Sequence, residues 1–326
     1  MSKKILRILS IDGGGIRGVI PAMFMMEIEK RTGRRIADLF HLIAGSSTGG
    51  ILALGLTVPG KDGRPRYTAR DGLNLYEQEG PVIFQQTAWQ TLSSLANLVD
   101  EKYMSAPVEG VLDRYFGDAR LRDALTDVLI TAYDIERRIP WFFRSKRAIA
   151  LPEYDFPMKF VARATSAAPT YFETARINTE DGTDYYPLID GAVFANNPSM
   201  CAYVDALRHY PGYDGVLLVS LGTGQYTRRI PYERAKDWGL IEWVRPIIDI
   251  LMHGVNETVD YQMQSVLPIT PDGVQNYYRM QVVLDPSADK MDDVSPGNMR
   301  SLRLLAEEFI RKNEFMFDRL CRQLVE

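Results

Sequence analysis

The sequence contains few of the residues that build metal centres or disulfide frameworks. Its 326 residues include two cysteines, Cys201 and Cys321, which lie far apart and show no metal-ligand spacing. Only three histidines are present. This cysteine usage excludes a disulfide-stapled scaffold and suits a reducing compartment.

The chain also lacks long apolar runs and a strong excess of charge of either sign. No window approaches the roughly 18 apolar residues of a membrane span. The apolar run over residues 5–11 is too short and too interrupted for the core of a signal peptide. A formal net charge of −4 gives no reason to expect a nucleic-acid partner. We therefore expect a cytoplasmic protein.

Apolar stretches alternate along the chain with helical patterns. Strands are predicted at residues 5–11, 41–45, 128–133, 140–143, 185–189, 216–221 and 277–284, and the main helices at 19–32, 50–55, 71–86, 105–116, 159–168, 198–209, 238–267 and 299–324. This alternation predicts an α/β fold with a mainly parallel sheet covered by helices on both faces. We find no repeat or linker, so we expect one domain over residues 1–326, in which residues 226–326 form a mostly helical part.

The stretch around Ser47 has the order strand, sharp turn, helix. Gly45 and Gly49 flank the serine in a Gly-x-Ser-x-Gly pattern. This order would present a nucleophilic hydroxyl at the end of a strand. The amides and dipole of the following helix would favour negative charge there. An ordinary strand-to-helix turn with a serine or threonine cap has a similar sequence.

A second glycine-rich segment, Asp12–Gly18, follows the first predicted strand. Gly13, Gly14 and Gly15 could offer bare backbone N–H groups to an oxyanion, and Arg17 would add a positive charge suited to a substrate phosphate. The same spacing matches a dinucleotide-binding fingerprint. However, the next strand ends in Gly-Ser-Ser rather than in the acidic residue that such a site uses.

Asp190 is the best candidate for a general base. It follows a predicted strand and precedes Gly191, although a turn aspartate that caps Gly191 and Ala192 has the same pattern. No histidine lies in a glycine-bounded loop after an acid, as a Ser–Asp–His order requires, and we interpret all three as structural or surface residues: His41, His209 and His253.

Taken together, these motifs resemble the patatin-like phospholipases. The matching stretches are Asp-Gly-Gly-Gly-Ile-Arg-Gly at 12–18, Gly-Ser-Ser-Thr-Gly at 45–49 and Asp-Gly-Ala at 190–192, with further similarity at 164–172, 196–198 and 220–224. The resemblance implies a three-layer α/β/α sandwich and a lipid acyl hydrolase that needs no metal or other cofactor. It also implies a Ser47–Asp190 dyad, in which Ser47 is the nucleophile and Asp190 the base, with Gly13, Gly14 and Gly15 as oxyanion donors.

The resemblance also implies substrates and partners. Membrane phospholipids or other acyl lipids would be hydrolysed by a serine esterase of the phospholipase A type, with peripheral contact at the membrane. Residues 84–98 could make that contact, and residues 87–103 fit either a packed helix or a cover over the site. Some bacterial patatin-like proteins of similar size are antiphage effectors that cyclic nucleotides switch on. A catalytically inactive or ligand-regulated module, with a cyclic nucleotide as activator, is therefore the alternative expectation.

Overall fold

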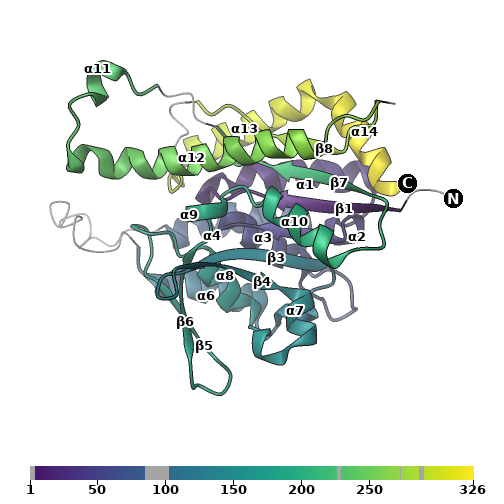
Figure 1. The fold of residues 1–326 in the computed structure, drawn as a ribbon, viewed down its shortest axis with the longest axis horizontal. Helices are drawn as coiled ribbons and strands as arrows, with labels where there is room; N and C mark the ends of the chain where they lie inside the picture. The colour runs from purple at the N-terminus through teal and green to yellow at the C-terminus, as the bar shows by residue number, and fades with distance from the viewer. Residues whose placement is uncertain (1–3, 85–102, 226–228, 272, 286–289) are drawn as a thin grey trace.

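The computed structural model describes residues 4–84, 103–225, 229–271, 273–285 and 290–326 (Figure 1). One mixed sheet runs through this part of the chain, with the strand order β5-β6-β3-β2-β1-β7-β8 and with β4 paired to β3. The strands are β1 (Ile5–Ile11), β2 (Leu42–Gly45), β3 (Asp127–Asp134), β4 (Ile139–Arg144), β5 (Ala175–Asn178), β6 (Tyr185–Asp190), β7 (Gly215–Leu221) and β8 (Tyr277–Met280).

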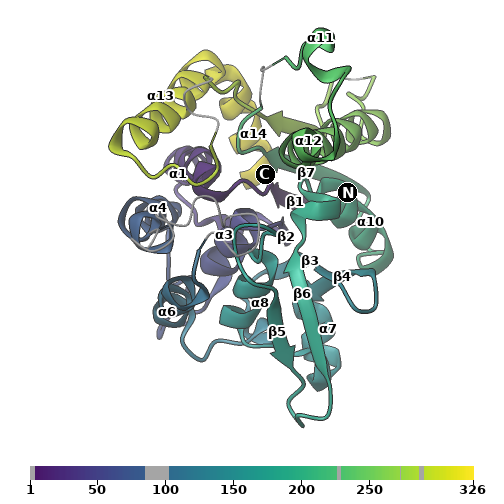
Figure 2. The ribbon, with the colours of Figure 1, turned by 90° about the vertical axis from the view of Figure 1, so that its left-hand side faces the viewer.

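Helices cover both faces of this sheet, as Figure 2 shows. One layer contains α1 (Val19–Thr32), α2 (Ile36–Leu39), α3 (Thr48–Thr57), α4 (Ala69–Ile83), α6 (Ser105–Phe116), α8 (Met158–Thr165), α13 (Pro296–Lys312) and α14 (Glu314–Val325). The other contains α9 (Ala192–Ala195), α10 (Ser199–His209) and α12 (Leu240–Val266). Two short helices, α7 (Ser145–Ala150) and α11 (Tyr232–Ala235), lie toward the periphery. The predicted three-layer α/β/α arrangement is confirmed.

The central strands are apolar at successive positions because each of them is buried on both sides. In β1, Leu9 and Ile11 enter the core beneath α1 and α3, whereas Leu6 and Ile8 enter the core beneath α10. Successive side chains of a strand point to opposite faces. Alternation between polar and apolar residues therefore disappears, as is typical of parallel strands between helices.

The prediction of a parallel sheet holds for the centre and not for one side. The pairings β1–β2, β1–β7, β2–β3 and β7–β8 are parallel. The pairings β3–β4, β3–β6 and β5–β6 are antiparallel. The four-residue strand β5 was not predicted, since only Ala175 and Ile177 of it are buried.

Two predictions about the C-terminal part need correction. The helix predicted over residues 299–324 is divided at Asn313 into α13 and α14. The strand predicted over 277–284 ends at Met280, and Val283 only forms an isolated bridge with Gln225. The proposed cover at 87–103 and membrane contact at 84–98 lie outside the described residues, apart from Tyr103 and Phe84.

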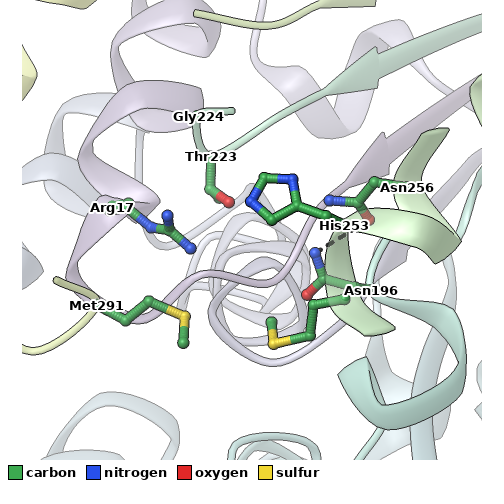
Figure 3. A pocket seen from close by; sticks show the side chains of 8 residues that line it. Arg17, Asn196, Thr223, Gly224, His253, Asn256 and Met291 are labelled. Atoms are coloured by element: carbon green, nitrogen blue, oxygen red, sulfur yellow. Dashed lines mark hydrogen bonds between the residues drawn. The ribbon is translucent and has the colours of Figure 1, made fainter. Parts of the chain in front are cut away.

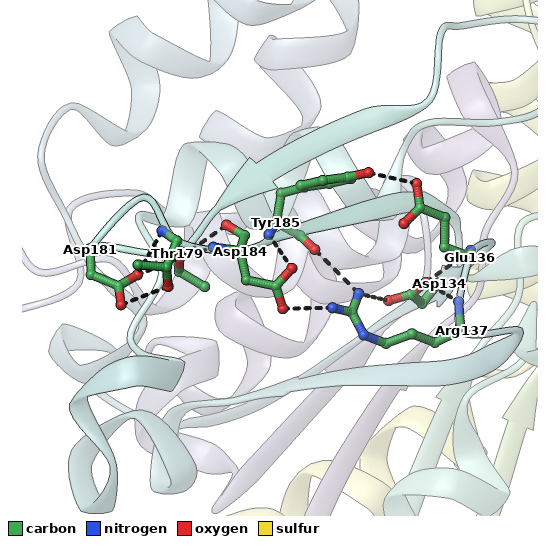
Figure 4. A network of polar contacts seen from close by, with 8 residues as sticks. Asp134, Glu136, Arg137, Thr179, Asp181, Asp184 and Tyr185 are labelled. Carbon is green, nitrogen blue, oxygen red and sulfur yellow. Dashed lines mark hydrogen bonds and ion pairs between the residues drawn. The ribbon is translucent and has the colours of Figure 1, made fainter.

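A polar network fastens the β5–β6 hairpin to the end of β3 (Figure 4). The Arg137 guanidinium donates to the Asp134 carboxylate at 2.9 Å and to the Asp184 carboxylate at 2.7 Å. Asp134 ends β3 and Asp184 directly precedes β6. These contacts therefore fix where β6 begins, and so help to set where it ends, at Asp190.

Candidate active site

Strand register places Ser47 and Asp190 at the same height across β3. Gly45, the last residue of β2, pairs with Ile130 of β3, and Asp190 pairs with Ala132, two residues further on. Ser47 is likewise two residues beyond Gly45. We expected Asp190 to reach this edge as the end of a parallel strand. Instead β6 runs antiparallel to β3. It begins beyond the carboxyl-end edge of the sheet and reaches that edge at its last residue, Asp190.

Ser47 occupies a strained turn between β2 and α3. Its backbone has φ 54° and ψ −124°, a conformation that non-glycine residues rarely adopt. Its amide donates to the Thr165 hydroxyl at 2.9 Å. A Cβ atom on Gly49 would overlap the Ile11 carbonyl, so this close approach of helix to strand requires glycine. The segment is thus a sharp strand-to-helix turn of the kind that can present a serine hydroxyl at the end of a strand.

The three sequence motifs meet at Gly13. A Cβ atom built on Gly13 would lie 3.2 Å from the Ser47 Cβ and 3.4 Å from the Ala192 Cβ. The glycine loop, the serine turn and the segment after Asp190 are therefore in contact. Both polar side chains are enclosed: Ser47 is 8% exposed and Asp190 is 2% exposed.

The environment of Asp190 suits a base that works near neutral pH. Burial raises the pKa of its carboxyl to about 7, against the opposing effect of hydrogen bonds from the Ser47 side chain and the Ala192 amide. The Ala192 amide donates to Asp190 Oδ1 at 2.8 Å. Asp190 thus caps its own turn and also lies beside the serine, so the two interpretations of its motif do not exclude each other.

Two of the three expected oxyanion amides are available, and the third is engaged. The Gly13 N–H donates to the Asn196 carbonyl at 3.0 Å, while the Gly13 carbonyl accepts from the Thr223 hydroxyl at 2.6 Å. Within the described part of the chain, the amides of Gly14 and Gly15 have no protein acceptor. In this structure the Gly13 N–H therefore already has a partner, unlike those of Gly14 and Gly15.

A small polar cavity lies beside the glycine loop (Figure 3). Arg17 and Met291 lie on one side of it and His253, Asn196 and Asn256 on the other. The Arg17 Nε donates to the Gly14 carbonyl at 3.2 Å, so the guanidinium is held against the loop. Within the described part of the chain, the lining residues are Arg17, Asn196, Thr223, Gly224, Met252, His253, Asn256 and Met291. These described residues include a guanidinium and no carboxylate, which suits an anionic group.

Two of the histidines lie away from this site. His41 precedes β2, where its Nδ1 accepts from the Arg7 amide at 3.0 Å. His209 ends α10, with its Nε2 3.6 Å from Asp205. His253, in contrast, lines the polar cavity. The sequence did not indicate this position, because α12 carries no recognised motif.

In the described ranges, no helix combines the length and the apolarity that crossing a bilayer requires. In the same ranges, no group of three or more His, Cys, Asp or Glu side chains could hold a metal ion.

Comparison with known proteins agrees with the motifs. A sequence model of the patatin-like phospholipase family matches residues 9–203. Probable inactive patatin-3-Kuras 1 of Solanum tuberosum is 32% identical over 335 residues, covering 95% of this chain and 87% of the relative. Patatin-like protein 1 of Arabidopsis thaliana is 31% identical over 338 residues, covering 94% and 81%. The crystal structure of VipD from Legionella pneumophila aligns with 94% of this chain and 67% of its own, at 12% identity and a TM-score of 0.37.

Proposed function

Because the chain belongs to the patatin-like phospholipase family, we propose that it is a serine lipid hydrolase that cleaves ester bonds of glycerophospholipids in a phospholipase A-type reaction. The observation that carries this proposal is the meeting of the three motifs at Gly13, which puts the strained Ser47 turn beside the enclosed Asp190 carboxyl. Nucleophile, base and oxyanion donors are the three parts that acyl transfer needs.

In the first half-reaction, Ser47 Oγ attacks the ester carbonyl while the Asp190 carboxylate accepts the hydroxyl proton. The amides of Gly14 and Gly15 stabilise the tetrahedral oxyanion, assisted by the N-terminus of α3. Asp190 then returns the proton to the leaving alkoxide. The lysophospholipid departs with that proton, and the acyl group remains on Ser47.

In the second half-reaction, water attacks the acyl-serine carbonyl and gives its proton to Asp190. Collapse of the tetrahedral intermediate breaks the bond to Ser47 Oγ, which takes the proton back from Asp190. The fatty acid leaves, and both side chains regain their starting protonation states.

The polar cavity supports a place for the substrate phosphate. Arg17 provides the fixed positive charge, and its contact with the Gly14 carbonyl couples the cavity to the oxyanion loop. A phosphodiester bound there would align the neighbouring ester over Ser47. The working protein would then act at a membrane surface, where such lipids are found.

The decisive experiment measures fatty-acid release from vesicles of mixed phospholipids. We expect the Ser47→Ala variant to lose a factor of about 10³ or more in turnover. Ser265→Ala is the matched control, because the Ser265 hydroxyl only donates to the Tyr261 carbonyl on the exposed face of α12. Equal release by the parent and by Ser47→Ala would refute the proposal.

The near-complete burial of Ser47 favours a ligand-regulated hydrolase as the second candidate. A serine-directed fluorophosphonate probe separates these cases. Labelling of Ser47 in the protein alone supports the unregulated enzyme. Labelling that requires an added cyclic nucleotide supports a regulated one, and no labelling with any of a panel of cyclic nucleotides supports an inactive module.

A further inference from the structure

A buried ion pair lies at the start of the glycine loop. Asp12, which is 0% exposed, follows β1 directly and precedes Gly13. The Arg279 guanidinium of β8 donates to Asp12 Oδ1 at 2.9 Å and to Asp12 Oδ2 at 2.6 Å. Its Nη1 also donates to the Ser220 hydroxyl at 2.8 Å. This two-pronged geometry fixes both distance and orientation of the carboxylate.

Removal of either Asp12 or Arg279 would destabilise the charge of the other. Burial raises the pKa of Asp12, and the Arg279 guanidinium opposes that shift. Burial lowers the pKa of Arg279, but the Asp12 carboxylate more than reverses this and leaves it above its ordinary value. If one partner is removed, the other becomes an uncompensated buried charge.

Two further backbone groups of the loop are also held from outside it. Thr223, just after β7, donates to the Gly13 carbonyl at 2.6 Å, and the Ile16 amide donates to the Met291 carbonyl at 2.8 Å. The backbone on either side of Gly14 and Gly15 is therefore fixed, while these two amides point to no protein acceptor in the described residues. Arg279 and Met291 both lie beyond residue 203, where the family match ends.

We propose that Arg279 is a positioning residue for the Gly14 and Gly15 oxyanion amides, so that the C-terminal part of the chain completes the active site. The fork on Asp12 fixes the direction in which the chain leaves β1 and enters the glycine loop. A displacement of about 1 Å in a catalytic group can lower the rate about 10²-fold. The catalytic part of this inference rests on the function proposed above.

The test compares Arg279→Gln, Arg279→Lys and the double variant Asp12→Asn/Arg279→Gln with the parent protein. Arg303→Gln is the control, since Arg303 makes an ion pair with Glu77 on the surface and is 44% exposed. For each protein, kcat and KM for phospholipid hydrolysis, the melting temperature, and deuterium uptake of the peptide covering residues 12–18 are measured.

We expect Arg279→Gln to lower kcat about 10²-fold and to leave KM within about threefold, because the transition state loses aligned donors while substrate contacts stay. Arg279→Lys should recover only part of kcat, since an ammonium cannot make the fork. The double variant removes the unpaired charge and should regain melting temperature, but not kcat. Arg303→Gln should match the parent in all measurements.

Deuterium uptake decides the inference independently of catalysis. The amides of Gly13 and Ile16 are hydrogen-bonded, so they should exchange faster in Arg279→Gln if the loop has lost its anchor. If the parent releases no fatty acid, the proposed function fails. The exchange comparison still tests whether Arg279 holds the glycine loop in place. Unchanged exchange in Arg279→Gln, or full recovery of kcat in the double variant, would overturn the proposal.

Discussion

Replacing Asp190 by asparagine tests the base and its enclosure together. The carboxyl is 2% exposed, and burial moves its pKa from the ordinary 3.8 to about 7. Asparagine has nearly the same shape and can still accept from the Ala192 amide, but it carries no charge. The variant therefore removes the ionisation and keeps the packing.

The raised pKa fixes the sign of the effect on stability. Folded Asp190 holds its proton up to a pH of about 7, whereas the unfolded chain releases it near 3.8. The stability that this proton contributes is fully present below pH 3.8 and is lost as the pH rises to about 7. The difference between a pKa of 3.8 and one of about 7 corresponds to about 4 kcal/mol. Relative to the parent, Asp190→Asn should thus gain up to about 4 kcal/mol between pH 4 and pH 8.

Urea unfolding of both proteins at several pH values measures this difference, because the other carboxylates contribute equally and cancel. Initial rates of fatty-acid release complete the test. The parent rate should rise with pH through about 7, as Asp190 becomes a free base. The variant should be slower by a factor of about 10²–10⁴, the usual contribution of a general base, and should not show this rise.

Asp237→Asn, at an exposed position, is the matched control and should keep the parent rate. If the free-energy difference between Asp190→Asn and the parent stays constant from pH 4 to pH 8, the Asp190 carboxyl is not enclosed in the folded protein. Parent-like turnover of Asp190→Asn would contradict its role as the base.

Two other substitutions probe the turn and the loop. Gly14→Ala places a Cβ atom on the buried Thr223 side chain, so the glycine loop must shift. We expect release of fatty acid to fall about 10²–10³-fold, as for loss of one oxyanion donor, and the melting temperature to fall as well. Parent-like release would remove Gly14 from the proposed donors. Ser47→Gly relieves the backbone strain of the positive φ at this position. It should therefore raise the free energy of unfolding by about 1 kcal/mol in urea titrations, while abolishing activity. A destabilised variant would show that the turn is not strained.

Much of the site could be predicted because it depends on local sequence. The turn around Ser47 requires glycine where helix and strand backbones touch. The resulting Gly-x-Ser-x-Gly pattern lies within the five residues 45–49, so it can be recognised from the sequence. The central strands could also be predicted from the sequence, because burial on both faces favours a largely apolar run such as Ile5–Ile11.

Features that depend on distant partners could not be predicted. The direction of β6 is set by its pairing with β3 and by the Arg137 contacts, which join residues about 50 positions apart. The engagement of the Gly13 amide depends on Asn196, and the partner of Asp12 is 267 positions away at Arg279. Nothing in the local sequence of these residues specifies such pairings.

The burial of the site affects both the pKa of Asp190 and the approach of a substrate to Ser47. The same burial that raises the pKa of Asp190 to about 7 leaves Ser47 only 8% exposed, so we expect neighbouring atoms to move when an ester binds at the proposed nucleophile. If water entered with that motion, the carboxylate would be solvated, its pKa would fall toward 3.8 and it would become a weaker base. An apolar acyl chain that replaces the displaced atoms would keep the carboxyl dry. A lipid substrate is therefore suited to this site in a way that a small water-soluble ester is not.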